Sequence, residues 1–207
     1  IAAMNSVPFV LPDDGLASIA GIALIMAEVV AGLSLGFALQ IGYGSAFIAG
    51  ETIANAMGLG FASMADPLTG SPSPVIGQFL SIIATFLLLA MDGHLLLIRF
   101  VVESYRALPP GDMMPAGAFE AIVRFGGTMF AAGAVIALPV TFTLILVQLV
   151  MAMLARTAPS LNLFSVGLPA TLLAGLVLLA IGAPVMGEAI TASLQQSLDL
   201  VQMLAGG

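Results

Sequence analysis

Residues 126–155 read GGTMFAAGAVIALPVTFTLILVQLVMAMLA, thirty consecutive positions without a charged side chain. About 20 apolar residues suffice for a helix to cross roughly 30 Å of hydrocarbon, so this stretch is long enough for a membrane-spanning helix. An exposed strand of the same composition would leave backbone N–H and C=O groups unpaired in lipid. The stretch therefore predicts an α-helix in an apolar environment.

Three further blocks have the same apolar character: residues 16–50, 75–102 and 161–186. The first block is long enough for more than one span. Pro139, Pro169 and Pro184 interrupt the later blocks, and a proline inside a helix removes one N–H and clashes with the preceding turn. We therefore predict an all-α fold of long, kinked hydrophobic helices arranged in hairpins.

Composition limits the function as strongly as it limits the fold. Of 207 residues, 60% are hydrophobic and 7% are charged, with four arginines, no lysine, eleven acidic residues, one histidine and no cysteine. So few charges cannot cover a soluble globule, so most of the exterior faces lipid or protein. Scattered arginines cannot bind a phosphate backbone, which excludes nucleic acid as a partner. Without cysteine, the chain can form neither disulfides nor thiolate metal sites. No catalytic motif is present. We therefore expect neither enzymatic activity nor a cofactor.

Small residues recur four positions apart in every block, as close helix packing in an apolar medium requires. The pairs include Ala17/Gly21, Gly32/Gly36, Gly127/Ala131, Gly133/Ala137, Thr171/Gly175 and Ala183/Gly187. A single pair arises easily by chance in a chain so rich in glycine and alanine. Taken together, the pairs predict an assembly of helices packed on helices.

After the fourth block, residues 188–204 read EAITASLQQSLDLVQML, with apolar residues every three or four positions. This spacing predicts an amphipathic helix with one apolar face. The segment has no lysine or arginine to attract anionic lipid, so we expect the face to dock on a protein partner rather than on a membrane surface.

Residues 58–74, GLGFASMADPLTGSPSP, form an irregular segment between two apolar blocks. Its glycines, Asp66-Pro67 and the closing Ser-Pro-Ser-Pro oppose helix formation. Phe61 and Met64 make it apolar as well as irregular. Irregular backbone at membrane depth is tolerated where protein buries it or where it lines a cavity, so the segment is either such an element or an exposed loop.

Several polar residues lie inside the apolar blocks. A carboxylate in a membrane, such as Glu28 or Glu51, is a candidate for ion or proton passage. A hydrogen-bonded structural glutamate explains either residue equally well. Asp92 and His94 could suggest acid–base or metal chemistry, but a single histidine makes a metal site improbable. We expect them to form a polar cluster within the helix packing, with Arg99 or Glu103 as a partner.

Residues 50–111 carry a set of specific motifs: Gly50-Glu51, GLGFASMADP, Pro74-Val75-Ile76-Gly77-Gln78-Phe79, Asp92-Gly93-His94 and Leu108-Pro109-Pro110-Gly111. Together they resemble the FliR family of flagellar biosynthesis proteins and, more distantly, its counterparts in virulence type III secretion. Members of that family begin with a further hydrophobic segment. Because the chain starts at Ile1 without a basic leader, we expect it to lack its true N-terminus.

The resemblance implies a subunit of the flagellar export gate, packed with FliP and FliQ in a helical assembly and working with FlhA and FlhB. Unfolded flagellar proteins would pass through this gate, in the bacterial inner membrane at the flagellar basal body, where the subunit also contacts lipid. Residues 1–111 would be the FliP-like part, and residues 112–207 the FliQ-like hairpin with the C-terminal helix 188–204.

In that family the segment that matches residues 58–74 is a plug loop in the pore. The resemblance implies this role for Gly58, Leu59, Gly60, Phe61, Met64, Asp66, Pro67 and Gly70. Two other classes of protein remain as alternatives. A stand-alone secondary transporter would also contain broken helices and an intramembrane glutamate, and a membrane scaffold would keep the loop away from any pore.

Overall fold

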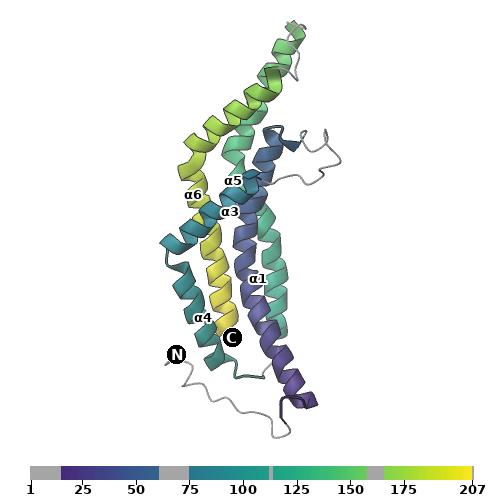
Figure 1. Ribbon diagram of the computed structural model, residues 1–207, viewed down its shortest axis with the longest axis vertical. Helices are drawn as coiled ribbons and strands as arrows, with labels where there is room; N and C mark the ends of the chain where they lie inside the picture. The colour runs from purple at the N-terminus through teal and green to yellow at the C-terminus, as the bar shows by residue number, and fades with distance from the viewer. Residues whose placement is uncertain (1–14, 61–74, 112–113, 158–165, 207) are drawn as a thin grey trace. The chain divides into compact units, whose positions relative to one another are not determined.

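The computed structural model describes residues 15–60, 75–111, 114–157 and 166–206. Its main helices are α1 (Ile19–Ala56), α3 (Val75–Ala90), α4 (Gly93–Ala107), α5 (Ala116–Thr157) and α6 (Leu168–Gly206) (Figure 1). No strand occurs within these described ranges. The predicted all-α fold is thereby confirmed.

The helices are longer and more continuous than their sequence suggests. The first block forms the single helix α1 of 38 residues, although it is long enough for more than one span. Pro139 and Pro184 lie inside α5 and α6. Pro169, predicted to kink a helix, instead lies in the first turn of α6, where a proline costs no hydrogen bond.

Three helices, α1, α5 and α6, are long and apolar enough to cross a membrane. α3 and α4 together form a fourth candidate span, bent by 69° at the break between them. At 1.5 Å per residue the three long helices are about 57–63 Å in length, roughly twice the hydrocarbon thickness of a bilayer.

The chain divides into two compact units. Unit 1 comprises Ile1–Gly42, Leu87–Met129 and Ser193–Gly207, and unit 2 comprises Tyr43–Phe86 and Phe130–Ala192. α1, α5 and α6 each contribute one part to each unit. Each unit therefore has its own packing, which is described separately below.

In unit 1 the last part of α6 packs against α1 and α4 (Figure 1). The α-carbon of Gly42 lies so close to Ser197 that a methyl group there would clash with the serine side chain. The α6 residues Leu194, Leu198, Val201 and Leu204 are at most 5% exposed. The predicted amphipathic helix 188–204 is therefore the end of α6, and the expected docking of its apolar face on a partner is wrong, because this chain itself buries that face.

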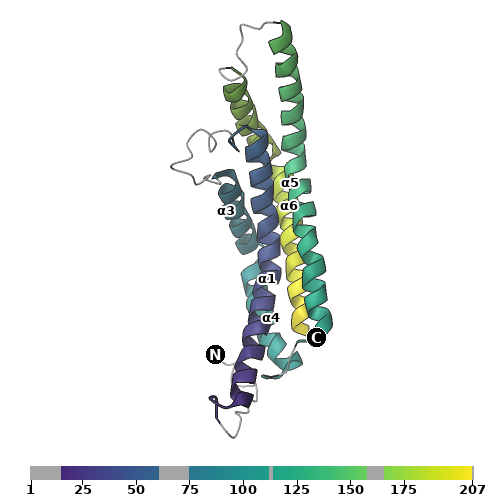
Figure 2. The same ribbon diagram turned by 90° about the vertical axis from the view of Figure 1, so that its right-hand side faces the viewer.

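In unit 2 the second part of α1 is the core element. Its residues Ser45, Ala46, Ala49 and Ile53 are fully buried, as is Met57, which directly follows it. α3 and α5 lie on different sides of this part of the helix (Figure 2). Small residues allow each neighbouring helix to contact α1 closely.

Three glycine positions show how closely the helices of unit 2 approach α1. A Cβ atom built on Gly50 would lie 2.5 Å from the Gly77 Cα of α3. One on Gly133 of α5 would lie 2.9 Å from Ile48, and one on Gly175 of α6 would lie 2.5 Å from Met57. The small-residue pairs 133/137 and 171/175 therefore mark real helix contacts. In contrast, the positions of Gly32, Gly36, Gly127 and Gly187 have no neighbouring atom within 4 Å among the described residues.

We predict that Gly50→Ala destabilises the protein by about 1–3 kcal/mol, because the added methyl group must push the α3 backbone away. Gly36→Ala is the matched control on the same helix, since its methyl group would meet no atom. It should leave stability unchanged or raise it by up to about 1 kcal/mol through helix propensity. Denaturant unfolding in detergent, followed by circular dichroism, measures both; equal midpoints for the two variants would contradict the contact.

Candidate functional site

The irregular segment 58–74 starts where α1 ends, and the structure describes its first three residues. The Gly58 N–H donates to the Asn55 carbonyl (3.0 Å), and the Leu59 N–H donates to the Ala54 carbonyl (3.0 Å). Gly58 has a φ of 84°, which is the left-handed conformation. Together with the two hydrogen bonds, this glycine forms a Schellman motif, a common way for a helix to end. The glycine thus terminates α1 at a defined residue. The other candidate loop residues, Phe61, Met64, Asp66, Pro67 and Gly70, lie outside the described residues.

Side chains of two other helices contact the last carbonyl groups of α1. Gln148 Nε2 of α5 donates to the Ala56 carbonyl oxygen at 2.7 Å. Thr171 Oγ1 of α6 is buried and donates to the Met57 carbonyl oxygen at 3.2 Å, a bond shared with the Leu168 carbonyl oxygen of its own helix at 3.0 Å. Sequence reasoning missed both roles. Gln148 is the only amide side chain in the charge-free stretch 126–155, and that isolation is the signal that could have identified it.

The helix that follows the segment, α3, packs against the same part of α1. α3 begins at Val75, and Gly77 in its first turn packs against the backbone of Gly50. Glu51 Oε1 is buried beside Gly77 and accepts no hydrogen bond from the described residues. The first turn of a helix carries unpaired N–H groups and a partial positive charge, which favours a carboxylate nearby. The Glu51 carboxylate thus lies beside the N-terminal turn of α3.

Glu28, the other candidate glutamate, belongs to unit 1. The Gly111 N–H donates to Glu28 Oε1 at 3.3 Å, and Tyr105 lies beside the same carboxylate. Gly111 has a φ of 99° and ends the Pro109-Pro110-Gly111 turn that follows α4. Glu28 therefore joins α1 to this turn across 83 positions of sequence.

Asp92 separates α3 from α4 through its backbone. It adopts the left-handed conformation (φ 56°, ψ 21°), and its side chain makes no capping hydrogen bond. Its carbonyl oxygen accepts hydrogen bonds from the N–H groups of Leu95 (2.9 Å) and Leu96 (3.1 Å). Aspartate tolerates this conformation better than most residues, so it can break a helix here.

The expected polar cluster around Asp92 and His94 is wrong. Arg99 Nε donates instead to Glu103 Oε1 at 2.8 Å, on the same exposed face of α4. His94 Nδ1 is buried without a hydrogen-bond partner among the residues that the structure describes. Among the residues that the structure describes, no hydrogen bond or ion pair joins Asp92, His94 and Arg99 to one another.

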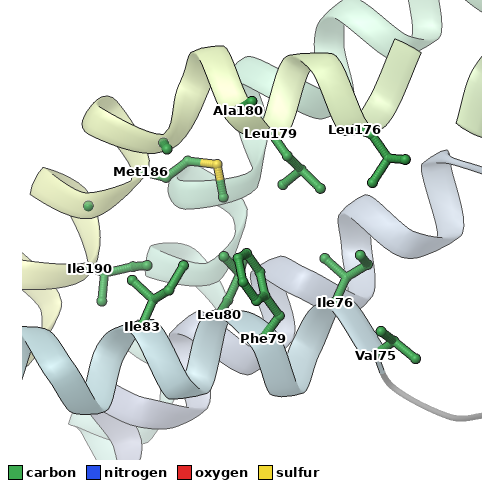
Figure 3. A pocket seen from close by; sticks show the side chains of 12 residues that line it. Val75, Ile76, Phe79, Leu80, Ile83, Leu176, Leu179, Ala180, Met186 and Ile190 are labelled. Atoms are coloured by element: carbon green, nitrogen blue, oxygen red, sulfur yellow. The ribbon is translucent and has the colours of Figure 1, made fainter. Parts of the chain in front are cut away.

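An apolar groove of about 430 Å³ lies between α3 and α6 in unit 2. Figure 3 shows Phe79 and Ile83 of α3 pointing toward Leu179 and Met186 of α6 across this groove. On the α6 side, the small side chains of Ala180 and Ala183 line the groove and leave space in it. The groove can hold an apolar group, and its lining offers no charged side chain.

The long apolar helices and their exposed apolar surface define the class of α-helical membrane proteins. The family model of the bacterial export proteins, family 1, matches residues 1–197. The chain belongs to this family.

Curated relatives carry the name flagellar biosynthetic protein FliR. The chain is 38% identical to that of Pectobacterium carotovorum subsp. carotovorum over 81% of its own length and 64% of the relative. For Escherichia coli (strain K12) the identity is 35%, over 76% of this chain and 60% of the relative. For Bacillus subtilis (strain 168) it is 33%, over 76% and 62%. The chain thus spans less than two thirds of the length of these relatives.

We predict that Glu28→Leu lowers the free energy of unfolding by about 1–3 kcal/mol, because the Gly111 N–H loses its charged acceptor. Glu28→Gln keeps an acceptor oxygen and should cost less than about 1 kcal/mol. Val29→Leu, an exposed position on the same helix, serves as the control. Unfolding in detergent gives the stabilities. If Glu28→Gln instead abolished protein export while leaving assembly intact, a proton-linked role would replace the structural one.

Proposed function

We propose that this chain is a subunit of a flagellar type III export gate. Its membership of the bacterial export proteins, family 1, and the name of its relatives, flagellar biosynthetic protein, support this proposal. In this proposal it assembles with FliP and FliQ, works with FlhA and FlhB, and lets unfolded flagellar proteins leave the cytoplasm. Its place would be the bacterial inner membrane at the flagellar basal body. Residues 1–111 would correspond to FliP and residues 112–207 to FliQ.

The observation that carries this proposal is the length of the exposed apolar surface. Large exposed apolar side chains extend from Ile19 to Phe47 on α1, from Phe119 to Leu154 on α5 and from Leu173 to Met203 on α6. At 1.5 Å per residue these stretches measure about 42, 53 and 45 Å.

A bilayer alone cannot cover such stretches. Its hydrocarbon core is about 30 Å thick, and a helix tilted by about 40°, the upper end of the usual range, has a path of only about 39 Å within it. The remaining apolar surface must therefore be covered by other protein chains. A subunit packed among several neighbours satisfies this need, whereas a stand-alone transporter does not.

The apolar groove between α3 and α6 supports the same proposal. Small residues at Ala180 and Ala183 allow a neighbouring helix to approach closely, as in other helix contacts within apolar media. We assign the groove to an apolar helix of a partner subunit, FliP or FliQ.

We further propose that residues 58–74 form part of the closed pore plug. Apolar side chains such as Phe61 and Met64 can obstruct a pore by excluding water, so gating is steric and needs no bond-making chemistry. The contacts at the end of α1, from which the segment departs, support this role, because a plug must start from a defined position. Glu28, Glu51, Asp92, His94 and Arg99 are structural residues in this proposal.

Deleting residues 64–69 should raise the ion conductance of the assembled gate several-fold, because the deletion removes part of the apolar segment proposed to obstruct the pore. Purified gates in planar bilayers or liposomes provide the measurement. Replacing the same six residues with six Gly and Ser residues separates loss of apolar bulk from loss of length, and it should also leak. Unchanged conductance in both variants, with normal assembly, would refute the plug.

Ala183→Phe should reduce copurification of FliP and FliQ with the chain, because the ring fills the groove that a partner helix would occupy. Ile181→Phe is the control on the same helix, at a position that is 72% exposed and outside the groove. The folded state of both variants is checked by circular dichroism. If copurification is normal but bound lipid is lost from Ala183→Phe, the groove holds an acyl chain instead of a helix.

A further inference from the structure

The end of α1 has a complete set of hydrogen-bond partners. The last four carbonyl groups of a helix have no partner within the helix itself. Here the Ala54 and Asn55 carbonyls accept from the Leu59 and Gly58 N–H groups, both at 3.0 Å. The next two carbonyls, of Ala56 and Met57, accept from Gln148 and Thr171. Backbone therefore satisfies the first pair, and two other helices satisfy the second.

The two side chains differ from comparable polar residues on their helices. Thr143 on α5 and Thr191 on α6 bond the carbonyl four residues earlier in their own helix, at 2.9 and 2.8 Å. Such bonds stay local and join no helices. Gln148 instead reaches α1 across 92 positions of sequence. The Thr171 hydroxyl is shared between the Leu168 carbonyl oxygen of its own helix (3.0 Å) and the Met57 carbonyl oxygen (3.2 Å), 114 positions away.

Packing supports the same contact. Met57, whose carbonyl Thr171 contacts, is fully buried, and its side chain fills the space above Gly175 one turn further along α6. The close approach that Gly175 allows brings Thr171 within reach of α1. Because all these residues belong to unit 2, the contact is internal to one compact unit.

We infer that Gln148 and Thr171 are positioning residues that clamp the end of α1 and so fix the point from which residues 58–74 depart. This inference deepens the proposed function and rests on it, since the clamp matters to export only if that segment gates a pore. The bond to the Met57 carbonyl is buried, so losing its donor leaves a buried acceptor without a partner. Losing either donor therefore favours fraying of the last turn of α1.

The chain contains no cysteine, so a single Leu59→Cys substitution provides a unique reporter at the frayed end. In assembled gates, Gln148→Leu and Thr171→Val should each raise the rate of maleimide labelling at position 59 by about three- to fifteenfold, the range that one lost interhelical hydrogen bond gives. Thr171→Ser keeps the hydroxyl and should label at the original rate.

Thr143→Val and Thr191→Val are matched controls, because they remove hydroxyl groups that bond only within their own helices. They should leave labelling unchanged. Equal labelling in the clamp variants and these controls would overturn the inference.

Ion conductance of the same gates separates the clamp from the proposed function. Faster labelling together with higher conductance supports both. Faster labelling with unchanged conductance supports the clamp and counts against the plug. Copurification of the partner subunits confirms that each variant assembles before either measurement is made.

Discussion

In an apolar medium every backbone N–H and C=O group needs a partner inside the protein, because no water is present to supply one. Helices meet this need along their length and fail to meet it at their ends. The end of α1 shows the consequence: four consecutive carbonyls from Ala54 to Met57 are paired, two by backbone and two by side chains of α5 and α6. Polar side chains are rare in this chain, and the two donors, Gln148 and Thr171, each contact one of these carbonyls.

The same medium removes the hydrophobic drive between helices, so that close packing must hold them together. Glycine allows this at Gly50, Gly77 and Gly175, where an added methyl group would overlap a neighbour. These contacts centre on the second part of α1, which is the most buried segment of unit 2. The two helices that flank residues 58–74, α1 and α3, are joined by this packing.

The exposed apolar surface of the chain bears on its function. Membership of the bacterial export proteins, family 1, places the chain in protein transport, and its long helices carry more apolar surface than a bilayer covers. In the proposed gate, other chains as well as lipid would cover this apolar surface.

Sequence by itself determined the helical class, because charge-free stretches such as residues 126–155 leave no other structure with paired backbone groups. It also identified Gly58 and the Thr171/Gly175 pair as special positions, since local conformation and small size are properties of single residues. It could not assign the face of residues 188–204 to this chain's own core, because an amphipathic pattern shows that a face is buried and not what buries it. The partners of Glu28, Gln148 and Thr171 lie 83 to 114 positions away. Only the tertiary structure decided these contacts, since hydrogen bonds between distant segments depend on how the helices pack.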